Sequence, residues 1–179
     1  DVLILTKPIG TGTLSFARQI GRAPAAGLAE AEASMRALNR SAAGVMTAAG
    51  VTTATDITGF GLAGHLGEMA VQSGVEIEVY GASIPVFAGV LDLIRDGVVS
   101  GAVERNREYA ASFVKRAAGT PEDLETLLYD PQTSGGLLIA VRKSKAPALV
   151  AALHKKGVPA AAVIGRVLRK GPARIRLRA

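Results

Sequence analysis

The sequence predicts an α+β domain in which α-helices pack on a mixed β-sheet. Apolar runs at 2–6 and 137–141 are typical of buried strands, and the alternating segments 75–80 and 174–178 are typical of strands with one polar face. Helical segments lie between these strands without strict alternation, which favours an antiparallel or mixed sheet. Because 179 residues are the size of one ordinary domain, we expect a single domain over residues 1–179.

The helices are expected from apolar spacing, from propensity and from signals at their ends. An apolar stripe at helical spacing runs through 62–70 and stops at Gly74. Thr120 is expected to cap a later helix, with Pro121 at its first position. In chain order, helices are expected over 13–21, 28–39, 41–50, 62–74, 86–95, 120–128 and 144–157.

Two strands carry an alternating pattern that separates a polar face from an apolar one. Within 75–80, Val and Ile alternate with Glu76, Glu78 and Tyr80, so we expect both glutamates on a face open to water. Within 174–178, three Arg alternate with Ile and Leu, which predicts a half-buried strand with one charged face. A turn at 170–172 joins this strand to the strand before it.

Composition narrows the class of protein. Hydrophobic residues make up 49% of the sequence and aromatic residues only 4%, so the core should consist of Ala, Val, Leu and Ile. The absence of Cys excludes disulfides, thiolate metal sites and a Cys nucleophile, and favours a reducing compartment. No apolar stretch is long enough to span a membrane and no leader pattern is present, so we expect a cytoplasmic protein with no membrane partner. The start at Asp1, directly before an apolar run, indicates a piece of a longer protein.

The net charge of +6 is distributed unevenly. Residues 131–179 contain 11 of the 21 Lys and Arg and no acid, whereas residues 1–130 have a net charge of −5. Such a block indicates either a nucleic-acid surface or a solvated face that meets water or an acidic partner domain. We favour the second interpretation and do not expect nucleic acid as a partner. No aromatic side chains lie between the Lys and Arg residues, so none is available to stack on nucleobases.

The segment ATDITGFGLAG (54–64) places one carboxylate before three glycines. Asp56 has two interpretations: it could cap the helix that follows, or it could be one ligand of Mg²⁺ where glycines let a triphosphate approach the backbone. The sequence contains no paired-carboxylate spacing that would complete such a site. His65 is expected to be a surface residue near Glu68, and two histidines do not make a zinc site.

A second dense segment, DPQTSGG (130–136), is expected to be a loop. Its paired glycines and two hydroxyls, those of Thr133 and Ser134, are suited to an anion-binding nest of backbone N–H groups. The segment lacks the Lys and the spacing of a Walker loop, and an ordinary loop without function would fit equally well.

Five segments resemble, in this order, the C-terminal half of selenophosphate synthetase, also called selenide, water dikinase. They are KPIGTG (7–12), ATDITGFGLAGHLGEMA (54–70), RN (105–106), YDPQTSGGLLIAV (129–141) and AAVIGRV (161–167), and together they cover nearly the whole chain. The resemblance implies the fold shared with aminoimidazole ribonucleotide synthetase. It also implies a homodimer that uses ATP and Mg²⁺ to make selenophosphate, AMP and phosphate from hydrogen selenide and water.

The resemblance also implies roles for particular residues. Asp56 matches the aspartate that joins N-terminal aspartates in the metal and nucleotide-phosphate cluster. The reactive Cys or selenocysteine, the catalytic Lys and most of the ATP site belong to the N-terminal domain, which this chain lacks. We therefore assign no catalytic residue here and expect the isolated chain to be inactive. The residues expected to line the phosphate or substrate site are Thr58, Gly59, Asn106, Thr133, Ser134, Gly135 and Gly136.

Two other functions fit the same residues. A related ATP-dependent ligase or small-molecule kinase of this superfamily would keep Asp56 and act on a different substrate. A non-enzymatic RNA-binding module would use the basic C-terminal third instead, and its binding would weaken steeply with salt.

Overall fold

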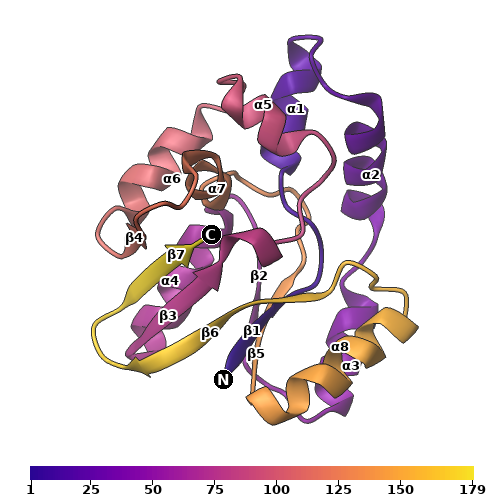
Figure 1. Cartoon of the computed structure of the whole chain (residues 1–179). Helices are drawn as coiled ribbons and strands as arrows, with labels where there is room; N and C mark the ends of the chain where they lie inside the picture. The colour runs from indigo at the N-terminus through magenta and orange to yellow at the C-terminus, as the bar shows by residue number, and fades with distance from the viewer.

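The computed structural model describes all of residues 1–179 as one seven-stranded mixed sheet with helices packed on it (Figure 1). This confirms the predicted α+β class. The strands are β1 (Val2–Leu5), β2 (Ala54–Asp56), β3 (Val75–Tyr80), β4 (Val114–Arg116), β5 (Leu137–Val141), β6 (Ala162–Lys170) and β7 (Arg174–Arg178). The helices are α1 (Thr11–Gln19), α2 (Ala25–Arg36), α3 (Arg40–Ala48), α4 (Gly61–Ser73), α5 (Val90–Arg95), α6 (Ala102–Ala110), α7 (Glu122–Leu128) and α8 (Ala146–Lys155), with 3₁₀ turns η1 (Gly81–Ser83) and η2 (Lys143–Lys145).

The strands follow the order β2-β5-β1-β6-β3-β7-β4 across the sheet. The four pairings from β2 to β3 are antiparallel, whereas β7 runs parallel to both of its neighbours, β3 and β4. The predicted turn at 170–172 does join β6 to β7, but the two strands do not pair, because β3 lies between them.

The sheet is covered differently at its two ends. At β1 and β5 both faces are buried: Leu3 and Leu5 belong to a larger core that includes residues of α1, α4 and α7, and Ile4 belongs to a smaller core with α3 and α8. This two-sided burial explains why VLIL reads as an unbroken apolar run. At β3 and β7 the helix α4 covers one face only (Figure 1).

The other face of β3 carries the two glutamates, and here the expectation of an open face is wrong. Glu76 and Glu78 are buried, with only 1% and 6% of their surface exposed. Arginines from the flanking strands cover them: Arg169 and Arg176 form ion pairs with Glu76, and Arg166 and Arg178 with Glu78. A buried carboxylate needs such partners. Four of the arginines in the basic C-terminal third are thus paired within the chain.

Several element boundaries differ from the expected ones. The strands β2 and β4 and the helix α6 are additional elements. The helix α5 begins only at Val90, because Val86 lies beside Ile9 in an extended bridge and Gly89 has a φ of 79°. Thr120 does not cap α7, since its hydroxyl donates to the carbonyl oxygen of Leu177 and Pro121 occupies the cap position.

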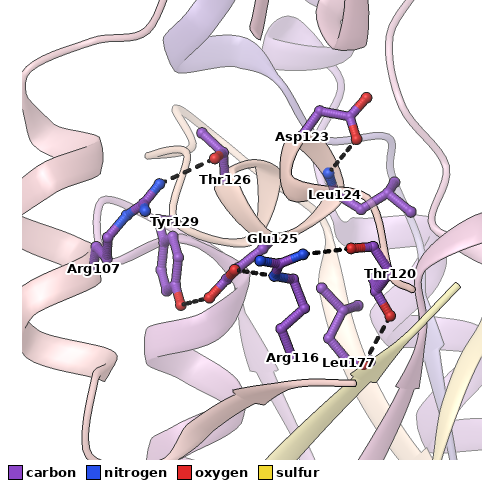
Figure 2. A network of polar contacts seen from close by, with 9 residues as sticks. All are labelled: Arg107, Arg116, Thr120, Asp123, Leu124, Glu125, Thr126, Tyr129 and Leu177. Atoms are coloured by element: carbon purple, nitrogen blue, oxygen red, sulfur yellow. Dashed lines mark hydrogen bonds and ion pairs between the residues drawn. The ribbon is translucent and has the colours of Figure 1, made fainter. Parts of the chain in front are cut away.

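Polar contacts fix α7 against the sheet and against α6 (Figure 2). Arg116 of β4 forms an ion pair of 2.8 Å with Glu125, and Glu125 also accepts a hydrogen bond from the Tyr129 hydroxyl. Arg107 of α6 donates to the Thr126 hydroxyl. Burial, followed by the nearby Glu125 charge, raises the pKa of Tyr129. The network holds the end of α7, where segment 130–136 begins.

None of the helices is both long enough and apolar enough to cross a membrane.

Candidate functional site

The sheet pairing brings the dense sequence segments together. Strand β5 is antiparallel to both of its neighbours, so its first residue lies beside the last residues of β1 and β2. Leu137 pairs with Asp56, and Leu138 pairs with Leu5. The segments 56–61 and 130–136, together with the loop before α1, therefore meet at one end of the sheet.

The segment 130–136 forms the N-terminal cap of α1, a helix without a capping side chain of its own. The Asp130 carboxylate accepts hydrogen bonds from the Gly12 N–H at 3.1 Å and from the Thr13 hydroxyl at 2.7 Å. The Gln132 side-chain oxygen accepts from the N–H groups of Gly10 and Thr11. These acceptors satisfy N–H groups that every helix start leaves open.

The Asp130 carboxyl is enclosed completely. Burial raises the pKa of Asp130 to about 6, while the hydrogen bonds from Thr13, Gln132 and Gly12 act in the opposite direction. A protonated carboxyl costs less to bury than a charged one, which is why burial raises the pKa.

Beyond this cap, the loop contains three backbone N–H groups without an acceptor, one on the exposed Ser134 and two on the buried Gly135 and Gly136. Thr133 donates its N–H to the Thr11 hydroxyl, but the N–H groups of Ser134, Gly135 and Gly136 have no acceptor within the protein. Ser134 is the one non-glycine residue with a positive φ, at 50°. A left-handed residue within a run of free N–H groups is a component of anion-binding nests.

Contacts behind the loop hold these residues in place. Lys7 donates to the carbonyl oxygens of Ser34, Ala37 and Ser134, and Asn39 donates to that of Gly135. Burial lowers the pKa of Lys7. A cavity of about 690 Å³ adjoins this side of the loop and is lined largely by apolar groups. The Lys7 amine has used its three hydrogens, so it supports the loop and is not free to bind an anion.

Asp56 stands alone at the end of β2. Its carboxylate is exposed and has no hydrogen bond or ion pair within the chain. The capping interpretation is wrong, because α4 begins at Gly61 and has no side-chain cap. No group of three His, Asp or Glu side chains could hold a metal ion within this chain. Asp56 can therefore supply one oxygen ligand, next to the strand that leads out of the 130–136 loop.

Three contacts define the turn between Asp56 and α4. The Ile57 N–H donates to the Gly136 carbonyl oxygen, and the Thr58 carbonyl oxygen accepts from the N–H groups of Gly61 and Gln132. Gly61 has a φ of 70°, and a side chain there would strike the carbonyl oxygen of Leu128 at 2.7 Å. A glycine is required at this position for both reasons.

Asn106 and His65 fix the same turn from the protein interior. The buried Asn106 side chain donates to the carbonyl oxygens of Gly59 and Tyr129, so it supports the turn from within. The expectation of a surface His65 is wrong: the residue is 7% exposed, and its Nε2 lies 3.1 Å from the Thr58 nitrogen. Nothing in the local pattern signals this contact, because Thr58 lies before the helix that carries His65.

The structure brings together most of the predicted site residues. Thr58 and Gly59 adjoin Asp56, and the segment Thr133–Gly136 lies beside it through the pairing of β2 with β5. The supporting roles of Lys7, Asp130 and Gln132 were not predicted. All three residues belong to the segments KPIGTG and DPQTSGG, which could have drawn attention to them. Their hydrogen bonds could not be predicted, because each joins residues more than a hundred positions apart in sequence.

Known proteins share this sequence and fold. Residues 1–178 match the family described as AIR synthase related protein, C-terminal domain. Selenide, water dikinase of Pelobacter propionicus is 44% identical over 175 residues, which are 98% of this chain and 50% of that protein. The enzyme of the same name from Caldanaerobacter subterraneus is 43% identical over 170 residues, or 95% of this chain and 49% of that protein. The chain thus spans about half the length of these curated relatives, and the predicted resemblance is confirmed.

Solved structures show the same fold at low identity. The hydrogenase maturation protein HypE of E. coli superposes with a TM-score of 0.66 at 20% identity, over 99% of this chain and 45% of that one. Thiamine-monophosphate kinase of Stenotrophomonas maltophilia gives a TM-score of 0.62 at 18% identity, over 99% and 49%. The match over residues 1–178 establishes that the chain belongs to the AIR synthase related protein C-terminal domain family.

Proposed function

We propose that this chain is the C-terminal half of a selenide, water dikinase, which converts ATP, selenide and water into selenophosphate, AMP and phosphate. The observation that carries the proposal is the adjacency of an unpaired carboxylate and free backbone donors: Asp56 lies beside the segment 134–136. A carboxylate binds a hard cation and free N–H groups bind phosphate oxygens, so the pair suits a metal-bound nucleotide.

The residues present fit one part of a Mg²⁺ site. Mg²⁺ usually takes one or two carboxylates, with water and phosphate oxygens completing its octahedron. Asp56 would supply one of these carboxylates, and the rest would come from the N-terminal half of the protein. When bound, the cation neutralises charge on the phosphate groups. We assign the nucleophile, the catalytic lysine and most of the ATP site to that N-terminal half, and a cytoplasmic homodimer to the whole protein.

Within this chain, each group has a defined task. The N–H groups of Ser134, Gly135 and Gly136 donate to phosphate oxygens, and the exposed Thr133 hydroxyl adds a further donor. Gly59 leaves open space beside the turn, where a side chain would meet no atom within 4 Å. Lys7, Asn106, Asp130 and Gln132 hold these groups in position.

The test uses the full-length protein with Asp56→Asn and a matched control, Glu108→Gln, an exposed carboxylate on α6. Because the Asp56 carboxylate has no internal partner, Asp56→Asn should leave the melting temperature nearly unchanged and abolish Mg²⁺-dependent AMP formation. Glu108→Gln should resemble the wild type in both measurements. Wild-type turnover by Asp56→Asn would show that Asp56 is no essential ligand. Phosphoryl transfer to another acceptor, without a need for selenide, would assign the protein to a related kinase or ligase.

A further inference from the structure

His65 lies in the second turn of α4, and its ring reaches back to the turn that precedes the helix. Side chains of an α-helix tilt toward its N-terminus, so the ring is directed at residues before Gly61. The Nε2 atom lies 3.1 Å from the Thr58 backbone nitrogen and 3.0 Å from the Thr58 hydroxyl.

This contact fixes the tautomer of the ring. A backbone N–H can only donate, so Nε2 must present its lone pair to Thr58. The proton of the neutral imidazole therefore lies on Nδ1. The Thr58 hydroxyl, which can donate as well, is directed at the same lone pair.

The Nδ1 side of the His65 ring has no hydrogen bond to hold it. Nδ1 is buried without a hydrogen-bond partner, and the nearest carboxylate oxygen, that of Glu68, lies 3.7 Å away. The Phe60 ring packs edge-on against the imidazole, with 6.2 Å between the ring centroids. The ring orientation is thus set mainly by packing and by the bond to Thr58.

His65 supplies the one acceptor for the Thr58 N–H. Three other backbone groups of the turn have partners elsewhere in the protein: Gly136 for the Ile57 N–H, Gln132 for the Thr58 carbonyl and Asn106 for the Gly59 carbonyl. Only Ile57 stands between Thr58 and Asp56, so the bond to His65 fixes the backbone directly after the strand that carries the Asp56 carboxylate.

We propose that His65, as the neutral Nδ1–H tautomer, is a positioning residue that orients the Asp56–Gly59 turn toward the bound metal and phosphate. The proposal rests on the proposed function, since it assigns His65 to the same site. Removing a group that orients a metal ligand typically changes metal affinity or activity by about 10- to 100-fold.

The test compares two neutral replacements. In His65→Gln the amide oxygen extends about as far as Nε2 and can accept from Thr58, whereas in His65→Asn it falls short. In the full-length protein, His65→Asn should raise the Mg²⁺ concentration for half-maximal turnover by about tenfold or more, and His65→Gln should recover most of that loss. The matched control is His154→Asn on the exposed side of α8, which should behave like the wild type.

A second measurement is independent of activity. Nitrogen NMR of the 179-residue chain at neutral pH should show an unprotonated Nε2 and a protonated Nδ1 for His65, with coupling to a downfield Thr58 amide proton. A protonated Nε2 would overturn the proposal, because the bond from Thr58 would then be impossible.

The outcomes separate this proposal from the proposed function. If both His65 variants keep the wild-type Mg²⁺ dependence while Asp56→Asn is inactive, His65 has no positioning role and the proposed function stands. A lowered melting temperature in both variants, with unchanged Mg²⁺ dependence, would likewise show a merely structural residue. If the full-length protein has no selenide-dependent turnover, the proposed function fails, and the NMR tautomer still supports or overturns the contact with Thr58.

Discussion

The Asp130 carboxylate accepts a hydrogen bond of 2.7 Å from the Thr13 hydroxyl, although 117 residues separate them in sequence. This bond joins the 130–136 loop to the start of α1. It also buries an ionisable group completely, so the contact should be sensitive to pH.

We expect Asp130 to make the stability of the domain depend on pH. Its pKa is raised from an ordinary 3.8 to about 6, so the folded state holds the proton more tightly than the unfolded state. The stabilisation from this group is fully present below pH 3.8 and is lost as the pH rises through about 6, a fall of about 3 kcal/mol.

Urea unfolding between pH 4 and 7 checks this expectation. Asp130→Asn should remove the slope, since an amide does not titrate. The control is Asp96→Asn, which removes a surface carboxylate paired with Arg22 and should keep the slope. Equal slopes in wild type and Asp130→Asn would contradict the assignment.

Gly135 and Gly59 should respond differently to a methyl group. A Cβ at Gly135 would overlap the carbonyl oxygen of Ile57, whereas one at Gly59 would meet nothing within 4 Å. We expect Gly135→Ala to lower the free energy of unfolding by about 2 kcal/mol or more. Gly59→Ala should lower it by less than about 1 kcal/mol. Chemical denaturation of both variants tests the pair, and similar losses would mean that the loop can move away from Ile57.

Asn106 should contribute strongly to stability because one amide serves two carbonyl oxygens. Asn106→Ala leaves the carbonyls of Gly59 and Tyr129 without this donor, at an expected cost of about 2 to 3 kcal/mol. Asn39→Ala removes a single half-buried bond to Gly135 and should cost about 1 kcal/mol. The melting temperatures of the two variants should therefore differ, and an equal effect would show that the Asn106 bonds are replaced by water.

The isolated 179-residue chain should neither hydrolyse ATP nor form selenophosphate. It has no group of three side chains that could hold a metal ion, and it contains no Cys. Phosphorus NMR of the chain with ATP, Mg²⁺ and selenide should show unchanged ATP after prolonged incubation. Selenide-dependent formation of AMP by this chain alone would contradict the prediction and show that the catalytic groups lie within residues 1–179.

Local sequence pattern was a good guide to the strands and a poor guide to their neighbours. The strands β1 and β7 were predicted from local pattern. A strand buried on both faces, such as β1, has a continuous apolar run, and a strand buried on one face, such as β7, has alternating apolar and polar residues. Glu76 looked solvent-exposed for the same reason, since the pattern cannot show that Arg169 and Arg176 lie on the strands beside it.

In the candidate site, too, some features could be predicted from local sequence and others could not. The glycine-rich turn near Asp56 and the 130–136 loop could be found, because glycines and Asp-Pro have local conformational meaning. The burial of His65 and the α1 cap by Asp130 could not, because each depends on tertiary contacts that the local pattern does not encode.

The place of β7 in the sheet sets the order in which the domain can assemble on the ribosome. Synthesis delivers β7 after all the other strands, yet it lies in the interior of the sheet, and β4 pairs with no other strand. Until residues 174–178 emerge, β4 has no partner and β3 has one open edge, so part of the sheet must wait for the last of its own strands. Such non-local pairing slows folding and leaves a nascent strand edge exposed to other chains.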